Sequence, residues 1–394
     1  MDFNYSEEQQ LLADSLQKYL ASSYDFEARK KAVNSDPGFS QKAWAAFAEM
    51  GLMAIPFAAD AGGEAGGLGG GAVDMMAAME AFGEALVVEP VLDHVALASR
   101  LVAQTGTAAQ REAILPGLLD GSRKATFAFL ERGLRYALAP AATGVVKSAS
   151  GGWQLDGEKI VVIGAPLADL LVVSAQVSHG PGCPVSGGTG LFLVETGAPG
   201  VAISAYRTVD GQRAGDVTFN NVQLNADALL GGEGTEGLAL PQIEEAVDFA
   251  TALLCADAVG AMKSANDATL EYLKTRKQFG IAIGSFQALQ HRMVDMFMAC
   301  EQARSMAILA ACRVDAAKGA TDPAATNARK KAVSGAMVKI ADAARLISQE
   351  SVQLHGGMGM TEEMKVSHTF RRLTVLAQRF GDADHHLARY ASLN

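Results

Sequence analysis

The stretch Tyr272-Leu273-Lys274-Thr275-Arg276-Lys277-Gln278-Phe279-Gly280, with Ile283-Gly284-Ser285-Phe286-Gln287 close behind it, joins two long helical patterns. A cationic helix end runs into a glycine-containing turn, and a serine then begins a new helix. Arg276 offers a forked set of donors to an anion, Phe279 offers a ring face and Gln287 offers an amide. Alternatively, the stretch is a plain helix–turn–helix junction in which Arg276 only caps carbonyl groups at a helix end.

Hydrophobic periodicity on either side of this stretch divides the chain into three parts. From about residue 237, apolar residues recur at helical spacing through the segments 241–275, 285–318, 324–355 and 362–376. From about residue 122 the pattern consists of short apolar runs broken by Gly, Pro, Asp or Ser, namely 125–130, 152–155, 159–163, 170–174, 190–195 and 217–219. Helical patterns also open the chain, where Ser6 and Gln9 have the spacing of a capping box and the segments 41–52 and 73–86 follow.

This order predicts the fold class and its domains. We expect an α+β protein with an N-terminal helical domain over 1–121, a middle antiparallel β-barrel or sandwich over 122–230 and a C-terminal four-helix bundle over 231–394. Such a bundle offers a long surface for oligomerisation, and the β domain can close one wall of a cleft. A glycine cluster at 62–71 lacks the preceding strand and the Gly-Lys-Ser/Thr ending of a phosphate loop, so we interpret it as a flexible surface loop.

Composition argues against several classes of function. The chain has 394 residues, 49% of them hydrophobic, and is long enough to bury a large core. Its net charge of −10 and the lack of a long lysine or arginine run argue against a nucleic-acid partner. The first residues are acidic and no apolar run reaches the ~20 residues of a membrane helix, so we expect a cytoplasmic protein with no membrane partner. The cysteines Cys183, Cys255, Cys300 and Cys312 are scattered, and we expect free thiols rather than metal ligands.

A second glycine-containing segment follows about 75 residues after the first: Gln353-Leu354-His355-Gly356-Gly357-Met358-Gly359-Met360-Thr361-Glu362-Glu363. Together with Arg276-Lys277-Gln278-Phe279-Gly280 and Phe286-Gln287, it resembles the two signatures of the acyl-CoA dehydrogenase family, in the expected order. The resemblance covers the whole chain. It implies an enzyme that uses FAD to convert an acyl-CoA thioester to the trans-2-enoyl-CoA, with an electron-transfer flavoprotein as electron acceptor.

The resemblance also implies which residues approach the cofactor. In the family, the residues of both signatures contact an FAD held mainly by a neighbouring subunit, and the matching positions here are Arg276, Phe279, Gln287, Gln353, Gly356 and Gly357. The chemistry agrees, because a pyrophosphate requires arginine and backbone N–H groups, and glycine permits close approach of the backbone. The pair Gly356-Gly357 can also be interpreted as a simple helix terminator.

The middle part departs from the family pattern in two places. Gly157-Glu158-Lys159-Ile160 and the segment 168–173 resemble the family's β-domain hairpin, but Val161 and Val162 stand where the family has a Trp beside the flavin. The family's Thr-Glu-Pro…Gly-Ser-Asp segment is missing, and the residues 129–136 take its place. We therefore expect different contacts to the flavin ring and to the acyl chain.

The largest departure concerns the catalytic base. Family members use a Glu in the turn before the last helix or, less often, on the helix before the first signature, and by spacing these positions fall near Gly381 and Ala250. Neither residue can take a proton. The nearby carboxylates belong to Asp382, Asp384 and Asp248, and we take Asp382 as the candidate base.

The alternative for Asp382 is an N-cap of the terminal helix, which explains the residue at least as well. Adjacent histidines on a helix point in different directions, so we expect His385 and His386 at a surface or an interface and predict no metal site.

The ends of the chain narrow the resemblance. The opening Met1-Asp2-Phe3-Asn4-Tyr5-Ser6-Glu7-Glu8-Gln9 and the closing Phe380-Gly381-Asp382-Ala383-Asp384-His385-His386-Leu387 are most similar to the small subunit of pimeloyl-CoA dehydrogenases. This branch implies a dicarboxyl-CoA or other unusual acyl-CoA substrate and a large acyl-CoA dehydrogenase subunit as partner in a heterotetramer. The alternative is a non-catalytic scaffold subunit that completes the FAD site of a catalytic partner, which the missing glutamate favours. An acyl-CoA oxidase shares the fold but usually carries a C-terminal extension that this sequence lacks.

Overall fold

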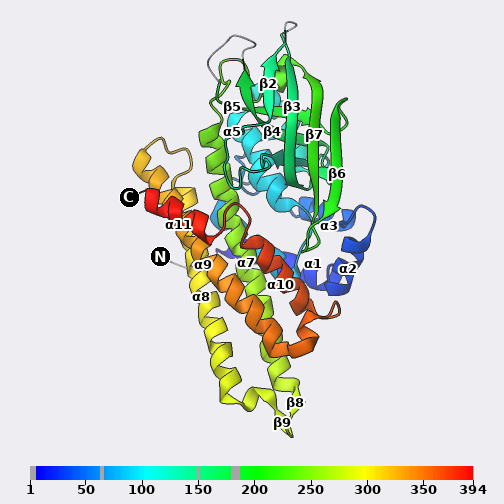
Figure 1. Ribbon diagram of the computed structural model, residues 1–394, viewed down its shortest axis with the longest axis vertical. Helices are drawn as coiled ribbons and strands as arrows, with labels where there is room; N and C mark the ends of the chain where they lie inside the picture. The colour runs from blue at the N-terminus through cyan, green and yellow to red at the C-terminus, as the bar shows by residue number, and fades with distance from the viewer. Residues whose placement is uncertain (1–5, 63–65, 149–150, 179–186, 394) are drawn as a thin grey trace. The chain divides into compact units, whose positions relative to one another are not determined.

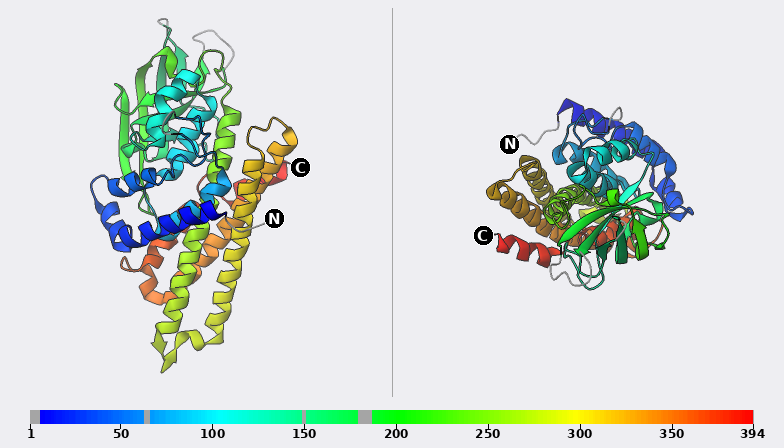
Figure 2. Two further views of the ribbon diagram at one scale, coloured as in Figure 1. Left: turned by 180° about the vertical axis from the view of Figure 1, so that it is seen from behind. Right: turned by 90° about the horizontal axis from the view of Figure 1, so that it is seen from above.

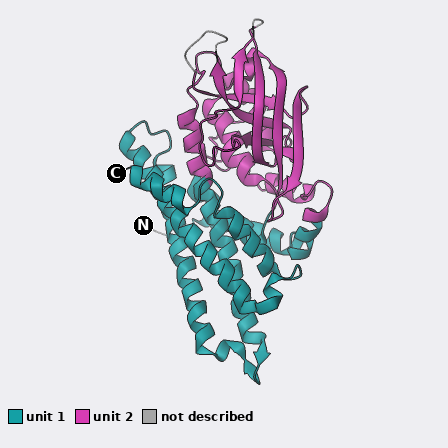
Figure 3. Cartoon of the chain, viewed as in Figure 1, with its two compact units in different colours: residues 1–31, 71–87, 251–394 teal, residues 32–70, 88–250 magenta. Residues whose placement is uncertain are grey.

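The computed structural model describes residues 6–62, 66–148, 151–178 and 187–393 (Figure 1). The chain divides into two compact units (Figure 3): unit 1 comprises residues 1–31, 71–87 and 251–394, and unit 2 comprises residues 32–70 and 88–250. The helices before the β part therefore belong to both units. The opening residues 1–5 and Cys183, on which two of the predictions rest, lie outside the described residues.

Unit 1 is built of helices that follow the predicted segments closely. Its elements are α1 (Glu7–Ser23), α4 (Ala72–Ala85), the larger part of α7 (Leu240–Thr275), α8 (Gln287–Ala316), α9 (Pro323–His355), α10 (Lys365–Leu376) and α11 (Ala383–Ser392). The predicted capping box is confirmed, because the Ser6 hydroxyl accepts the N–H of Gln9 while the Gln9 side chain accepts the N–H of Ser6. At α9, Asp322 caps the first N–H groups and Pro323 occupies the first helical position, where a missing N–H costs nothing.

The long helices of unit 1 pack through small side chains. Helices α8 and α9 lie side by side (Figure 2). Small side chains allow this close packing, because buried alanines recur along α8 at positions 303, 307, 310 and 311, and along α9 at 336, 341, 343 and 344. On α7, Asn266 donates to the Met296 carbonyl of α8, and Asp257 forms a buried ion pair with Arg372 of α10. The Asp315 carboxylate of α8 accepts the N–H groups of Ala72 and Val73 at the start of α4.

Unit 2 contains the predicted β part as one seven-stranded sheet in the order β1-β4-β2-β3-β7-β6, with β5 paired to β4. The strands are β1 (Ala125–Ala128), β2 (Gly144–Lys147), β3 (Trp153–Ile163), β4 (Leu170–Ser178), β5 (Thr189–Glu195), β6 (Val201–Arg207) and β7 (Arg213–Leu224). The expected runs 152–155 and 159–163 form the single strand β3, and β2 and β6 were not predicted. Most pairs are antiparallel as expected, but β4 pairs in parallel with both β1 and β2. Parallel pairing needs a long connection between the two strands. Residues 129–143, β2 and β3 separate β1 from β4, and β3 separates β2 from β4.

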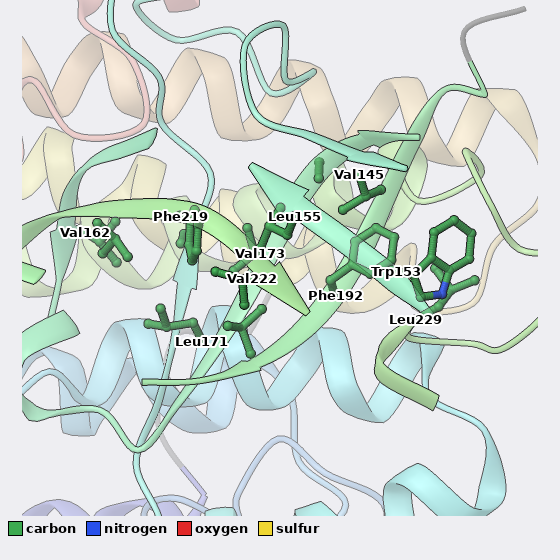
Figure 4. Packing of buried hydrophobic residues seen from close by; sticks show 14 of the residues in the cluster. Val145, Trp153, Leu155, Val162, Leu171, Val173, Phe192, Phe219, Val222 and Leu229 are labelled. Atoms are coloured by element: carbon green, nitrogen blue, oxygen red, sulfur yellow. The ribbon is translucent and has the colours of Figure 1, made fainter. Parts of the chain in front are cut away.

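One face of the sheet carries a buried hydrophobic core cluster of unit 2 (Figure 4). Trp153 on β3 meets Phe192 on β5 edge to face, with ring centroids 5.4 Å apart. Val145, Leu155 and Val173 fill the space beside them and are fully buried. Trp153 and Leu155 both face this core and the intervening Gln154 does not, as the alternation of side chains along a strand requires.

Unit 2 also contains helices α3 (Gln41–Glu49), α5 (Arg100–Thr105) and α6 (Ala108–Leu119), a π-helical stretch at Leu92–Ser99, the end of α2 (Phe26–Asn34) and the start of α7. The described glycines of the cluster at 62–71 do not form a phosphate cradle, because the N–H groups of Gly67, Gly69 and Gly70 donate to the carbonyls of Ala58, Phe57 and Ile55. Cys255, Cys300 and Cys312 are free, as predicted, and burial raises the pKa of Cys255 and of Cys300 to about 12. Among the described residues, no helix is both long enough and apolar enough to span a bilayer.

Candidate functional site

The first predicted segment forms a two-residue hairpin at the end of α7 (Figure 1). Strand β8 (Lys277–Gln278) pairs with β9 (Ile281–Ala282), and Phe279 and Gly280 make the turn with φ angles of 51° and 83°. Positive φ at both turn positions is the geometry that suits a two-residue hairpin, but it is strained for a phenylalanine. The Phe279 side chain is 90% exposed. Apart from one edge contact with the Phe286 ring, this strained and exposed aromatic residue gains little in its own unit, and strained residues cluster at functional sites.

The residues after the hairpin return the chain to α8. Ile283 donates its N–H to the Arg276 carbonyl, which closes the base of the hairpin. The Phe286 ring lies edge-on to that of Phe279, with centroids 6.2 Å apart. Arg276 and Gln287 are both exposed, the first at the end of α7 and the second as the first residue of α8.

The second predicted segment ends α9. Gln353 lies exposed in its last turn, and the N–H of Gly356 donates back to the Gln353 carbonyl. Gly356 has φ 60° and ψ −147°, a conformation that only glycine adopts readily. A Cβ atom at Gly356 or Gly357 would meet nothing within 4 Å, so the surroundings leave the backbone open to a ligand.

The structure brings the two segments together within unit 1. The rings of Tyr272 and His355 stack with centroids 4.4 Å apart and planes inclined by 27°. Tyr272 stands four residues before Arg276, and His355 directly precedes Gly356. The His355 ring is fixed by its Nδ1, 2.7 Å from the Ser351 carbonyl, and burial lowers its pKa. Nearby, Arg292 of α8 pairs with Glu350 of α9. All six predicted cofactor-contact residues are therefore exposed on adjoining segments of one unit.

The turn before α11 contains the position of the missing glutamate. Phe380 and Gly381 have φ angles of 60° and 138°, and α11 begins immediately after Asp382. The Asp382 carboxylate accepts the N–H of His385 at 2.8 Å, so this residue caps the helix. That contact agrees with the alternative prediction for Asp382 and occupies one of its oxygens. His386, which we expected at a surface or an interface, is instead 2% exposed.

The other positions predicted for a base are Ala250 and Asp248, which both lie on α7 and are buried in unit 2. Asp384 is exposed in the first turn of α11.

Unit 2 contains a buried ion pair that the sequence did not reveal. Lys159 of β3 is fully buried, and its Nζ lies 2.8 Å from the Glu131 carboxylate and 3.2 Å from the Ser174 hydroxyl. Glu131 also accepts the N–H groups of Ala141, Ala142 and Thr143, which ties down the loop that replaces the family's Thr-Glu-Pro segment. Burial lowers the pKa of Lys159 to about 8, although Glu131 opposes this. Burial would raise the pKa of Glu131, but the hydrogen bonds from Lys159 and the backbone lower it to about 2.

Two residues beyond Lys159, the backbone of β3 is irregular. Val161 has φ 51°, which is an outlier for a β-branched residue, and the register with β7 shifts between Lys159 and Val162. The Val161 N–H donates to Asp216, which also accepts the Tyr206 hydroxyl at 2.8 Å. Desolvation, together with Asp216, raises the pKa of Tyr206 to about 12. The bulge turns a partly exposed valine outward at the position where the resemblance places a Trp beside the flavin.

Comparison with known proteins defines the class. The sequence models "Acyl-CoA dehydrogenase, N-terminal domain", "Acyl-CoA dehydrogenase, middle domain" and "Acyl-CoA dehydrogenase, C-terminal domain" match residues 6–122, 126–222 and 240–391 in that order. The chain belongs to the acyl-CoA dehydrogenase family, and it has the family's helical, β-sheet, helical architecture. It is thus an oxidoreductase of the acyl-CoA dehydrogenase type.

Similar proteins span nearly the whole chain. The short-chain-specific acyl-CoA dehydrogenase of Megasphaera elsdenii is 27% identical over 381 residues, which cover 94% of this chain and 94% of that protein. The acryloyl-CoA reductase (NADH) of Anaerotignum propionicum is 27% identical over 378 residues, which cover 94% of this chain and 90% of that protein. A chain in the crystal structure of the ChsE4–ChsE5 complex from Mycobacterium tuberculosis is 25% identical, with a TM-score of 0.84 over 100% of this chain and 98% of that one.

Proposed function

We propose that this chain is one subunit of a two-chain acyl-CoA dehydrogenase, with a larger subunit as partner in a heterotetramer. Its substrate is a dicarboxyl-CoA or another unusual acyl-CoA, as in the pimeloyl-CoA dehydrogenases whose small subunit it resembles. An electron-transfer flavoprotein accepts the electrons. In this proposal the domains are 1–121, 122–230 and 231–394. The structure of the ChsE4–ChsE5 complex, in which a similar chain is part of a complex, supports the heteromeric arrangement.

The observation that supports a cofactor site shared between chains is the exposure of the two signature segments side by side, and the missing glutamate favours a partner chain that differs from this one. A cofactor site that one chain completed alone would bury its aromatic contact, but Phe279 is 90% exposed at a strained turn. Such a residue becomes useful when another chain brings the ligand to it.

The residues of unit 1 fit the cofactor that the family uses. Arg276 supplies a forked, permanently charged donor for a phosphate, and the open backbone at Gly356 and Gly357 lets N–H groups approach it. Gln287 and Gln353 add amide donors and acceptors, and Phe279 adds a ring face. FAD, when bound, supplies the acceptor for the hydride that leaves the β-carbon of the thioester.

Removal of the α-proton requires a base on the other side of the substrate. Asp382 remains our candidate within this chain, with one carboxylate oxygen committed to the helix cap. The second candidate function follows from that commitment: a scaffold subunit that completes the FAD site while its partner supplies the base.

The two functions are separated by the flavin of the purified protein. The chain is purified alone and after co-expression with the proposed large subunit, and the visible spectrum is recorded before and after addition of a medium-chain dicarboxyl-CoA. Flavin bound only by the complex, and bleached equally in wild type and Asp382→Asn, supports the scaffold function. Bleaching by the isolated chain that is lost in Asp382→Asn makes this subunit catalytic. A complex that binds no flavin at all overturns both.

The matched control for Asp382→Asn is Asp384→Asn. Both residues lie at the start of α11, but Asp384 is exposed and Asp382 caps the helix. A loss of bleaching in both variants indicates damage to the helix and not removal of a base.

A further inference from the structure

The second signature segment, residues 353–363, has little packing around two of its glycines. A Cβ atom at Gly356 or Gly357 would meet nothing within 4 Å in the described part of the chain. Contacts at the two ends of the segment must therefore hold its backbone in place. At the first end, the ring of His355 is fixed by its stacking on Tyr272.

Helix α10 holds the second end of the segment. The Ser367 hydroxyl donates to the Thr361 carbonyl at 2.7 Å, and Arg371 donates to the Glu362 carboxylate at 2.7 Å. His368 adds a third contact, because its Nε2 lies 3.1 Å from the Glu362 carbonyl and 3.3 Å from a carboxylate oxygen of that residue. Although the Glu362 side chain is 70% exposed, both of its carboxylate oxygens therefore have a partner.

The other ring nitrogen of His368 faces Arg29 of α2, and this contact decides which tautomer is present. His368 Nδ1 lies 3.2 Å from a terminal nitrogen of Arg29. A guanidinium can only donate, so Nδ1 must accept and the ring proton must be on Nε2, which faces Glu362. Arg29 is 1% exposed and also donates to the Leu86 carbonyl, so its own position is fixed.

Burial and charge favour the same neutral state of His368. Burial lowers the pKa of the ring, and Arg29 and Arg371 act in the same direction, whereas Glu362 opposes them. The Phe26 ring meets the imidazole edge-on, with centroids 4.9 Å apart. A buried ring that is hydrogen-bonded at both nitrogens is held in one orientation, so it ties the position of Glu362 to that of Arg29.

We infer that His368 is a positioning residue, which as a bridge between Arg29 and Glu362 holds the second end of the signature segment. The backbone at Gly356 and Gly357 thereby keeps the conformation in which it meets the cofactor. The link to the cofactor rests on the proposed function, in which residues of both signature segments contact FAD. His368 acts through the segment and takes no part in proton transfer.

Three substitutions of His368 distinguish the two ring nitrogens. In His368→Gln the side-chain amide can place an N–H near the position of Nε2 and restore the donor to Glu362. In His368→Asn the shorter side chain reaches only the region of Nδ1, so it can accept from Arg29 but not donate to Glu362. His368→Leu removes both contacts and keeps an apolar side chain.

Hydrogen exchange of the isolated chain tests the positioning, because the N–H groups of Gly356 and Thr361 both donate within the segment. Both groups should exchange about tenfold faster than wild type in His368→Leu and His368→Asn, and within about threefold of wild type in His368→Gln. Glu362→Ala should behave as His368→Leu does. Glu363→Ala, which changes the exposed neighbour, is the matched control and should exchange as wild type.

Two results of the exchange experiment would overturn the inference. The first is exchange at the wild-type rate in His368→Asn, because Glu362 then needs no donor from position 368. The second is equal acceleration in His368→Asn and His368→Gln, because loss of the imidazole packing would then explain the effect without a bridge. If His368→Leu does not fold, the comparison of the two amide variants decides the question.

Flavin affinity of the assembled complex tests the link to the cofactor. His368→Asn is expected to weaken FAD binding about fivefold, because the binding conformation of the segment is less populated, and His368→Gln should bind within about twofold of wild type. The bleaching rate at saturating FAD should be the same in all three proteins. Wild-type affinity in His368→Asn, despite faster exchange of the segment, would overturn the link to the cofactor. A wild-type complex that binds no flavin would count against the proposed function and would leave the exchange result untouched.

Discussion

Two Phe-Gly pairs of unit 1 have positive φ at both residues but opposite surroundings. Phe279-Gly280 has φ angles of 51° and 83°, and Phe380-Gly381 has φ angles of 60° and 138°. At Gly280 a Cβ atom would meet nothing within 4 Å, but at Gly381 it would overlap two histidine rings. The first turn is exposed and the second is buried or partly buried.

The difference separates two reasons for glycine. At Gly280 only the backbone angle requires it, which is the usual reason in a two-residue hairpin. At Gly381 both the angle and the lack of space require it. The exposed turn at Phe279-Gly280, the open turn, fits a surface that contacts a ligand bound to another chain. The turn at Phe380-Gly381, the filled turn, is already packed by residues of its own chain.

The largest effect should come from placing alanine in both turns. Gly381→Ala is expected to reduce the free energy of unfolding by about 3 kcal/mol, because overpacking adds to backbone strain. Gly280→Ala should reduce it by only about 1 kcal/mol, the cost of the left-handed conformation. Urea denaturation of both variants measures the contrast. Similar losses at the two positions would remove the distinction between an open turn and a filled one.

Sequence patterns predicted the long helices well because periodicity and caps are local. Ser6 and Gln9 form the capping box, and α7 to α10 begin and end within three residues of the expected segments. Strands β2 and β6 escaped notice because Gly144–Lys147 is only four residues long and Val201–Arg207 faces outward for most of its length. The parallel pairs of β4 depend on contacts between distant segments, which no local pattern encodes.

The candidate site was also predicted only in part, because its geometry depends on contacts between distant segments. The residues of both signatures could be named from the sequence, but their proximity depends on the stacking of Tyr272 on His355. The Lys159–Glu131 ion pair joins residues 28 positions apart and was not foreseen, although both lie in segments that already looked unusual. The closure of Gly381 by His386 depends on how α11 packs against α9, and the adjacent histidines gave no sign of it.

Acid should destabilise the filled turn and leave the open one unaffected. The pKa of His386 in the folded chain, about 3, is far below its ordinary value of 6.5. The unfolded chain therefore binds the proton more readily, so this contribution to stability is complete above pH 6.5 and is lost as the pH falls toward 3. Between pH 6.5 and pH 5 the loss is about 2 kcal/mol.

The measurement compares urea denaturation of wild type and His386→Ala at both pH values. His385, Arg389 and Asp382 face the His386 ring and are present in both proteins, so the difference between the two slopes isolates His386. Parallel slopes would show that the ring is not held neutral by the fold.

A change at the base of the open turn should affect the cofactor and not the fold. In the assembled complex, Arg276→Ala is expected to weaken flavin binding about tenfold, equivalent to about 1.4 kcal/mol, because a charge-assisted hydrogen bond is lost. Fluorescence titration of the apo complex with FAD measures the affinity. Lys274→Ala, an exposed cation in the last turn of α7, is the matched control and should bind as wild type. Equal weakening in both variants would point to a general loss of positive charge.

The smallest expected effect is that of Phe279→Asn, which should increase the stability of the chain and weaken flavin binding. Asparagine tolerates positive φ far better than phenylalanine, and Asn-Gly is the preferred pair for a two-residue hairpin. Phe279→Asn should therefore raise the free energy of unfolding of the isolated chain by about 0.5–1 kcal/mol, while flavin binding by the complex weakens because the ring is lost. Phe279→Ala, which removes the ring but keeps the strain, should weaken binding equally without adding stability. If Phe279→Asn binds flavin as tightly as wild type, the strained phenylalanine does not contact the cofactor, and the exposure of its turn does not mark a cofactor site.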